Sequence, residues 1–149
     1  MNGNQLTTVL IIDEHEAVCE VLARRIEGFG GFRVVQATTN PVLAAEIAHE
    51  FSPKIIIADF KRGPRPRPEM VRWMKKASPT SRVVIYASYY TDGERESFAE
   101  AGADRCLLKG MSASELGREL HLLGESGGAG AARIEARYDA TIISQRTID

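Results

Sequence analysis

The sequence predicts an α/β fold in which a parallel sheet is covered by helices on both faces. Short apolar runs alternate with amphipathic stretches five times along the first ~120 residues. The apolar runs are continuous rather than alternating, which is typical of strands buried on both faces. With 149 residues, 44% hydrophobic and 26% charged, the chain has the size and composition of one globular domain.

The N-terminal half supplies two strand–helix pairs and a third strand. Strands are expected at Val9–Ile12, Phe32–Val35 and Ile55–Ala58. Asn40 and Pro41 mark the start of the second helix, because asparagine is a favoured N-cap and proline fits the first helical turn. The stripes expected to be buried are Val18, Val21, Leu22 and Ile26 in the first helix and Leu43, Ala44, Ile47, Ala48 and Phe51 in the second.

The C-terminal half supplies the remaining elements. Strands are expected at Val83–Tyr86 and Cys106–Leu108. Gly102 ends the fourth helix, because glycine readily adopts the left-handed conformation of a helix C-terminus. Ser112 and Glu115 form a capping-box pattern before the last helix. The residues expected to face the core are Met70, Val71 and Met74 in the third helix and Leu116, Leu120 and Leu123 in the last.

Five such pairs, joined by right-handed crossovers, predict a doubly wound (βα)5 sheet with the flavodoxin-like strand order 2-1-3-4-5. The carboxyl ends of its strands meet at one edge, where such sheets bind ligands. Asp13 and Glu14 follow the first strand, Asp59 follows the third, and Lys109 follows the fifth. We therefore expect three carboxylates and one ammonium group to converge at this edge.

A cluster of this kind suits Mg²⁺ and phosphate chemistry. Carboxylates with open positions bind Mg²⁺, which screens the repulsion between an attacking carboxylate and a phosphate. Aspartate is a known nucleophile for acyl-phosphate formation, and a lysine attracts the transferred group by its charge. Taken singly, Asp13 is as readily a turn or N-cap residue, and Lys109 is more often a solvated surface charge. The prediction depends on their coincidence at three strand ends.

The bulk properties exclude several classes of protein. A net charge of −1 gives no overall attraction to nucleic acid or to an anionic membrane. No apolar run approaches the ~20 residues needed to cross a bilayer. We therefore expect a cytoplasmic protein without membrane association and without direct nucleic-acid binding by this chain. Cys19 and Cys106 are expected to be buried thiols rather than a disulfide.

The composition also divides the chain. Residues 1–7 are short and polar and are expected to be disordered, whereas 8–123 hold all the predicted strands and helices. Residues 124–149 begin with a stretch rich in glycine and alanine and are expected to be a linker and a tail.

Through its strand ends, the chain resembles the receiver domains of bacterial response regulators in two-component signalling. The resemblance runs from about Thr8 to Leu123 and is strongest over Val9–Glu14, Ile55–Asp59 and Ala101–Lys109. The last of these segments is similar to receivers that often carry a C-terminal helix-turn-helix domain.

The resemblance implies a role for each charged residue of the cluster. Asp59 would be the phosphoacceptor, and Lys109 would contact the phosphoryl group. Asp13 and Glu14 would hold Mg²⁺ together with Asp59. Lys61 would lend its backbone carbonyl to the metal and its side chain to the entrance of the site. The implied partners are a histidine kinase or histidine phosphotransfer protein, and a homodimer through the fourth and fifth α/β units is left open.

Several positions depart from the pattern of this family. Where the family has threonine or serine at the end of the fourth strand, a gap-free alignment places Ala87, with Ser88 one residue later. Cys106 stands in place of the aromatic residue three positions before the lysine, and Gly110 in place of the proline after it. Glu14 replaces an aspartate and moves its charge by one methylene. We expect these changes to weaken signalling more than the phosphorylation chemistry.

The loop after the acceptor differs as well. Residues 61–68 carry Pro64, Pro66 and Pro68 at alternate positions, which favours an extended polyproline segment. The arginines of this segment would attract an acidic partner, although a solvated loop is the simpler explanation for them.

Three functions are weighed on these residues. A phosphoacceptor switch is favoured by the intact Asp13, Asp59 and Lys109. A pseudo-receiver, which signals by protein interaction without phosphorylation, is favoured by the changed switch positions. A small enzyme or nucleotide binder would need phosphate-cradling glycines after the first strand, where 14–16 carry Glu-His-Glu instead. We expect the first function, with no enzymatic activity beyond self-catalysed phosphotransfer and autodephosphorylation.

Overall fold

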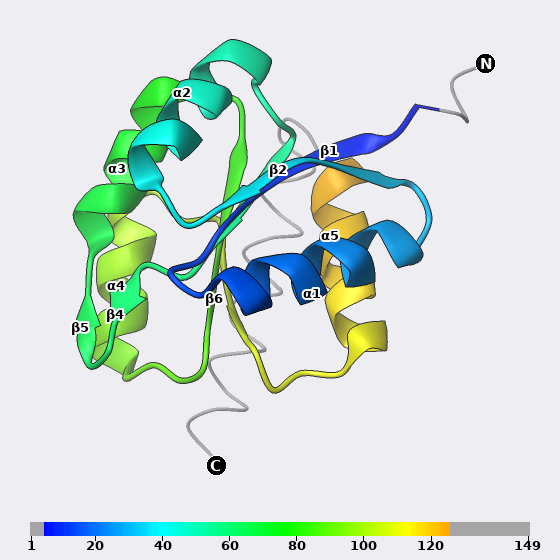
Figure 1. Cartoon of the computed structure of the whole chain (residues 1–149). Coiled ribbons are helices and arrows are strands. Elements are labelled where there is room, and N and C mark those ends of the chain that lie inside the picture. The colour runs from blue at the N-terminus through cyan, green and yellow to red at the C-terminus, as the bar shows by residue number, and fades with distance from the viewer. Residues whose placement is uncertain (1–4, 126–149) are drawn as a thin grey trace.

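A five-stranded parallel sheet forms the centre of the computed structural model, which describes residues 5–125 (Figure 1). Its strand order is β2-β1-β3-β6-β7, and every neighbouring pair is parallel. Numbered within this sheet alone, the order is 2-1-3-4-5, so the predicted doubly wound (βα)5 fold is confirmed. The strands are β1 (Thr7–Ile12), β2 (Phe32–Thr38), β3 (Ile55–Ala58), β6 (Arg82–Ala87) and β7 (Arg105–Leu108).

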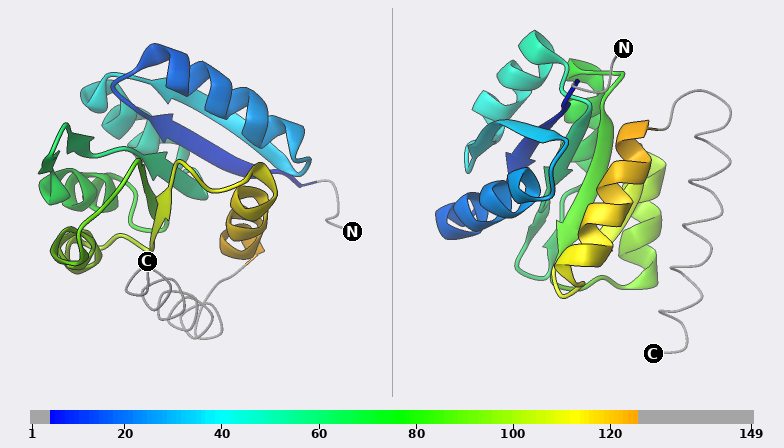
Figure 2. Two further views of the ribbon diagram at one scale, coloured as in Figure 1. Left: turned by 90° about the horizontal axis from the view of Figure 1, so that it is seen from below. Right: turned by 90° about the vertical axis from the view of Figure 1, so that its right-hand side faces the viewer.

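Helices cover both faces of this sheet. The helices α1 and α5 lie on one face and α2, α3 and α4 on the other (Figure 2). Their bounds are α1 (Glu16–Gly28), α2 (Pro41–Phe51), α3 (Pro68–Ala77), α4 (Asp92–Ala101) and α5 (Ala113–Glu125). Among the described residues, no helix is long and apolar enough to cross a membrane.

The central strands hold the charged edge of the sheet in place. Successive side chains of a strand point to opposite faces, so β1 sends Ile11 toward α1 and α5 and Ile12 toward the other layer. In β3, Ile57 and Ala58 divide in the same way. Both faces of β1 and β3 are buried and closely packed, so these strands hold the residues that follow them in fixed positions.

Two of the predicted helical stripes are corrected by the structure. In α1, Val21 is 51% exposed, and Cys19 lies in the core instead. In α2, Leu43 and Phe51 are exposed, and a row of alanines faces the sheet. Small side chains let a helix pack close to the strands, so the larger residues are displaced to its flanks. The stripes predicted for α3 and α5 are confirmed, with Met70, Val71, Met74, Leu116, Leu120 and Leu123 all buried.

The predicted helix ends are confirmed. The Oδ1 of Asn40 accepts hydrogen bonds from the backbone N–H groups at the start of α2, at 2.9 and 3.3 Å. Gly102 has a φ of 114° at the end of α4. Ser112 and Glu115 bond reciprocally in a capping box before α5.

The boundaries of the domain differ slightly from those predicted. The strand β1 begins at Thr7, inside the segment expected to be disordered, and α5 continues through Glu125, beyond the expected linker boundary. The remaining predictions for the termini concern residues 1–4 and 126–149, which lie outside the described part of the chain.

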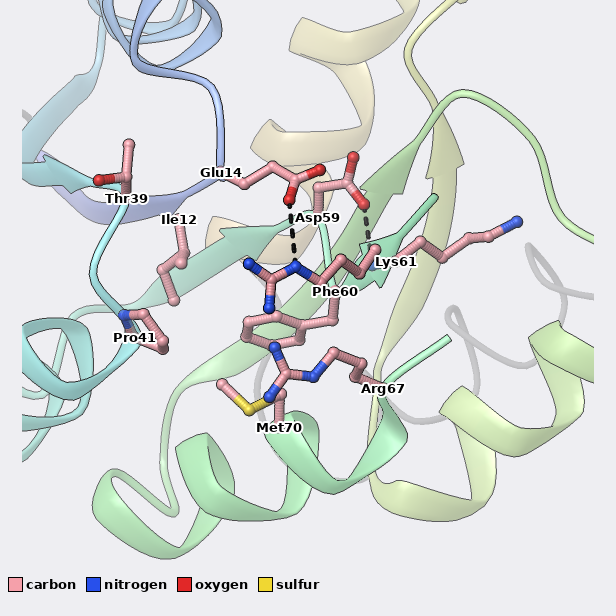
Figure 3. A pocket seen from close by; sticks show the side chains of 10 residues that line it. Ile12, Glu14, Thr39, Pro41, Asp59, Phe60, Lys61, Arg67 and Met70 are labelled. Carbon is pink, nitrogen blue, oxygen red and sulfur yellow. Dashed lines mark hydrogen bonds and ion pairs between the residues drawn. The ribbon is translucent and has the colours of Figure 1, made fainter. Parts of the chain in front are cut away.

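The polyproline prediction for residues 61–68 is wrong. The strand β4 (Lys61–Arg62) pairs antiparallel with β5 (Arg65–Pro66) in a short hairpin. Gly63 has a φ of 61° in the turn, and this left-handed conformation allows the chain to reverse before Pro64 and Pro66. Pro68 is the first residue of α3. The hairpin therefore folds back beside Asp59 instead of extending away from it (Figure 3).

Candidate functional site

The carboxyl edge of the sheet brings three of the predicted residues together. Lys109 Nζ lies 2.8 Å from Asp13 Oδ2 and 2.8 Å from Asp59 Oδ2. These residues follow β7, β1 and β3, so the predicted convergence of the strand ends is confirmed for them. One ammonium group therefore bridges two carboxylates from different strands.

Backbone groups fix both carboxylates. The N–H of His15 donates to Asp13 Oδ1 at 2.9 Å, and the N–H of Lys61 donates to Asp59 Oδ1 at 3.0 Å. Each carboxylate thus has one oxygen held by the main chain and one facing Lys109. The side chain of Asp13 is only 3% exposed, whereas that of Asp59 is 13% exposed. Asp59 is therefore the more accessible of the two.

The charge of Lys109 is stabilised at this position. Burial alone would lower the pKa of Lys109, but hydrogen bonds to Asp13 and Asp59 and the negative charges of both carboxylates outweigh it. The net effect raises the pKa above its usual value of 10.5. Lys109 therefore stays protonated and supplies a fixed positive charge beside Asp59.

Glu14 is turned away from the Lys109 bridge. Its Oε1 lies 3.8 Å from Arg62 Nε (Figure 3). Its Oε2 lies 3.5 Å from His15 Nε2. Within residues 5–125, no group of three acidic, histidine or cysteine side chains is arranged to hold a metal ion. The predicted set of three carboxylates is therefore not assembled in this conformation.

The chemistry of the donors nevertheless fits a hard cation. Asp13 and Asp59 already share one positive charge, that of Lys109, between two of their oxygens. Carboxylate oxygens are the ligands that Mg²⁺ prefers. Glu14, on the neighbouring loop, would join such a site only by turning away from Arg62.

A cavity opens beside the Asp59 carboxylate. It has a volume of about 140 Å³, and its walls include Glu14, Thr39, Asp59, Arg62 and Arg67. Figure 3 shows Glu14, Thr39, Asp59 and Arg67 around this space. The two arginines offset the negative charge of the carboxylates, so the cavity combines carboxylate oxygens with groups that attract an anion.

Lys61 does not point to the entrance of the site, and this part of the prediction is wrong. Its side chain is 4% exposed and crosses to the loop after β6. Lys61 Nζ donates to the backbone oxygen of Tyr89 at 3.1 Å and to Glu94 Oε1 at 3.0 Å. It also lies 3.6 Å from the centre of the Tyr89 ring. The side chain turns inward because these three partners solvate its charge.

Glu94 connects this lysine to the start of α4. Its carboxylate accepts hydrogen bonds from the Lys61 ammonium group and from the N–H of Thr91. The Thr91 hydroxyl in turn accepts a hydrogen bond from the N–H of Glu94. Burial opposes ionisation, but the bonds from Thr91 and Lys61 outweigh it and lower the pKa of Glu94. The Thr-x-x-Glu pattern at 91–94 is a signal in the sequence for this capping box.

Ala87, Ser88 and Cys106 stand where the receiver pattern has a hydroxyl residue and an aromatic residue. Ala87 is buried and carries no hydroxyl, and Ser88 is exposed just beyond β6. Cys106 is buried in β7. Tyr90, for which no sequence motif predicts a role, places its hydroxyl 2.8 Å from the Ile85 backbone oxygen and 2.6 Å from that of Leu107. It thereby ties the loop after β6 to both neighbouring strands.

The cysteines behave as predicted for buried thiols. Both Cys19 and Cys106 are buried, and neither forms a disulfide. Burial, together with the negative charge of Asp13, raises the pKa of the Cys19 thiol.

Comparison with known proteins identifies the family. The family model of the response regulator receiver domain matches residues 9–121, which is most of the chain. The chain belongs to the response regulator receiver domain family. The receiver resemblance drawn from the strand ends is thereby confirmed.

Relatives of this receiver domain are bacterial response regulators. The response regulator protein VraR of Staphylococcus saprophyticus is 31% identical over 108 residues, which cover 72% of this chain and 52% of VraR. The receiver domain described here thus spans about half the length of that relative.

Solved structures show the same fold. A DNA-binding response regulator of the LuxR family from Staphylococcus aureus has a TM-score of 0.71 at 21% identity, covering 80% of this chain and all of that one. A response regulator from Burkholderia pseudomallei with a phosphorylated aspartic acid, calcium ion and citrate has a TM-score of 0.68 at 21% identity. The match covers 91% of this chain and 74% of the Burkholderia protein.

Proposed function

We propose that this receiver domain is a phosphoacceptor switch in which Asp59 takes a phosphoryl group from a histidine kinase or histidine phosphotransfer protein. The observation that carries the proposal is the bridge from Lys109 to both Asp13 and Asp59, at 2.8 Å each. It combines an accessible carboxylate, a second carboxylate and a fixed cation at one edge of the sheet. We further propose that the domain acts in the cytoplasm.

The transfer step uses the carboxylate of Asp59 as the nucleophile. One of its oxygens attacks the phosphorus atom of the donor, and an oxygen–phosphorus bond forms as the bond to the leaving group breaks. The leaving group keeps the electron pair, and Asp59 becomes an acyl phosphate. Lys109 then shifts its charge from the carboxylate pair toward the new phosphoryl oxygens. Beyond this transfer and the later hydrolysis of the acyl phosphate, the domain has no enzymatic activity.

Asp13, Asp59 and Glu14 would hold Mg²⁺ during this step, with the backbone carbonyl of Lys61 as a further ligand. When bound, Mg²⁺ supplies positive charge that screens the repulsion between the carboxylate and the incoming phosphate. Glu14 would have to leave Arg62 to join such a site, and the freed arginine would remain beside the cavity next to Asp59.

A docking surface for the phosphoryl donor lies next to Lys109. A cavity of about 310 Å³ runs between α1 and the end of β6, and Lys109 forms part of its wall. Val21, which is 51% exposed, lies on the same wall. Exposed apolar side chains beside a reactive group suit the docking of a partner protein.

The phosphorylated state is transmitted through Lys61. Its backbone N–H bonds Asp59 Oδ1, and its ammonium bonds Glu94 Oε1 in the capping box of α4. An acyl phosphate changes the charge and the bonding of Asp59, and Lys61 is in direct contact with it. In this chain, which has Ala87 in place of a hydroxyl, the lysine carries the change to the start of α4.

A second candidate function is a pseudo-receiver that binds partners without phosphorylation. The observations that favour it are Ala87 at the end of β6 and the Glu14 carboxylate paired with Arg62 rather than with Asp13 and Asp59. The accessible Asp59 beside Lys109 weighs against it, because partner binding alone does not require an accessible carboxylate next to a fixed ammonium group.

The two functions are separated by incubating the protein with acetyl phosphate, with and without Mg²⁺, and measuring its mass. The switch predicts an adduct of one phosphoryl group that depends on Mg²⁺ and is lost in Asp59→Asn. Glu69→Gln, an exposed carboxylate on α3, is the matched control and should give the wild-type adduct. If neither an adduct nor Mg²⁺ binding is observed, the pseudo-receiver is the correct function.

A further inference from the structure

The guanidinium group of Arg95 is not fully hydrogen-bonded within the described part of the domain. Within residues 5–125, the buried side-chain atoms without a hydrogen bond are Nε and Nη1 of Arg95. Arg95 lies on α4 and is only 7% exposed. A buried guanidinium with unsatisfied N–H groups is unfavourable, and such exceptions are rare in folded proteins. The unbonded nitrogen atoms of Arg95 therefore suit an anionic ligand that would accept their hydrogen bonds.

Arg95 lines a cavity between α4 and β7. Its volume is about 260 Å³, which corresponds to roughly nine waters of the liquid. Ala99, Ala103 and Cys106 contribute small side chains to the walls. The space is therefore large enough for a small organic molecule, and part of its lining is apolar.

The remaining charges of the cavity are of two kinds. Asp104 is engaged by Lys75 at 3.0 Å, and Arg105 is paired with Glu119 at 3.3 Å, so these side chains are already compensated. Asp92 and Glu96 are exposed carboxylates of α4 that also line the cavity. The cavity thus has a cation at its buried part and negative charges at its exposed part.

This arrangement selects the chemical class of the ligand. A multiply charged anion such as phosphate would meet Arg95 but would be repelled by Asp92 and Glu96. A molecule with one carboxylate and one ammonium group complements both parts. An apolar side chain on the same molecule would be removed from water against Ala99 and Cys106.

We propose that this cavity binds a small zwitterion of the amino-acid type with an apolar side chain. Its carboxylate accepts hydrogen bonds from Arg95, and its ammonium group faces Asp92 and Glu96. The site shares no residue with the acceptor cluster and does not depend on phosphorylation of Asp59.

The test is a titration of the full chain with free leucine, followed by calorimetry and by amide NMR. Two analogues complete the set: isocaproate lacks the ammonium group, and isopentylamine lacks the carboxylate. Leucine should bind saturably, and each analogue should bind at least about tenfold more weakly, as expected for loss of a hydrogen bond to a charged group. Equal binding of either analogue, or no saturable binding of leucine, would overturn the proposal.

Variants locate the site. Arg95→Met should weaken leucine binding by at least about tenfold, and Arg72→Met, an exposed arginine on α3, should not change it. Without leucine, Arg95→Met should be no less stable than the wild type, because it removes an unpaired buried charge. Leucine binding unchanged in Arg95→Met would contradict the assignment.

A second pair of changes keeps the test independent of the stability of Arg95 variants. Asp92→Asn combined with Glu96→Gln changes only exposed side chains, so folding should be preserved. The double variant should bind leucine more weakly and isocaproate at least as well as the wild type does. If its leucine affinity is unchanged, the ammonium group does not face these carboxylates and the proposal fails.

Discussion

Lys109 is the residue on which the electrostatics of the acceptor site depend. It compensates Asp13 and Asp59 at the same time, and within residues 5–125 the other hydrogen bonds to these carboxylates come from backbone N–H groups. Removing the ammonium group would leave two negative charges close together in a largely buried place. The stability of the domain therefore carries information about this site.

Lys109→Met should lower the free energy of unfolding by about 2 kcal/mol in the absence of divalent cations. Mg²⁺ should recover part of this loss, because it supplies positive charge to the same two carboxylates. Lys54→Met, at an exposed position, should change stability by less than about 0.5 kcal/mol. Urea denaturation with and without Mg²⁺ measures all three values. A Lys109→Met variant as stable as the wild type would show that the bridge contributes nothing.

The pH dependence of this contribution has a defined sign. The folded-state pKa of Lys109 is raised above 10.5, so its stabilisation is present in full below about pH 10.5 and is lost as the pH rises through the folded value. The difference in unfolding free energy between wild type and Lys109→Met should therefore be constant near neutral pH and shrink only in strong alkali. A difference that already shrinks between pH 7 and 9 would contradict the raised pKa.

At the scale of single elements, α4 is fixed at both ends by local chemistry. Thr91 and Glu94 cap its start, and Gly102 ends it in the left-handed conformation. Lys61 adds a tertiary bond to the capping glutamate. The helix α4 is therefore in direct contact, through Lys61 and Glu94, with the loop that follows β3.

Glu94→Gln tests the first end of α4. Because the pKa of Glu94 is lowered in the folded state, its stabilisation is present above about pH 4.5 and is lost as the pH falls through the folded value. The variant should be less stable than the wild type at pH 7 and closer to it at pH 3. Glu96→Gln, exposed on the same helix, serves as the control and should change stability by less than about 0.5 kcal/mol at pH 7. Thermal unfolding across this pH range measures both.

Gly102→Ala tests the other end. The φ of 114° is unfavourable for alanine, and the added methyl group would lie 3.3 Å from Lys75 Cγ, so a loss of about 1–2 kcal/mol is expected. Gly93→Ala is the matched change inside the first turn of α4. Its added methyl group would have no atom within 4 Å apart from its chain neighbours and the backbone of its own helix. This change should be neutral or stabilise by up to about 1 kcal/mol. Urea denaturation showing equal effects at the two positions would contradict the assigned left-handed end.

At the scale of the whole molecule, the sheet explains how much could be predicted from sequence. Asp13, Asp59 and Lys109 are separated along the chain, yet parallel strands must bring their carboxyl ends together, so their convergence was predictable. The direction of the Lys61 side chain was not, because it depends on Glu94, 33 positions away, and on a hairpin that alternate prolines do not suggest.

The buried faces of the helices also show which features the sequence could predict and which it could not. Periodicity predicted the core residues of α3 and α5, which pack large side chains on the sheet. In α2 it predicted the buried Ala44 and Ala48 correctly but was wrong for Phe51, which is exposed. Hydrophobicity ranks phenylalanine above alanine, but the closeness of the helix to the sheet decides which fits, and that distance is a property of the assembled fold.

The coupling from Asp59 to α4 is tested by following the amide NMR signals of Thr91 and Glu94 when acetyl phosphate and Mg²⁺ are added. In the wild type, phosphorylation of Asp59 should shift both signals. In Lys61→Met, mass spectrometry should show the same adduct, but the two signals should stay near their unphosphorylated positions. If the adduct forms and these signals do not move in the wild type, or move equally in Lys61→Met, the proposed coupling from Asp59 to α4 is wrong.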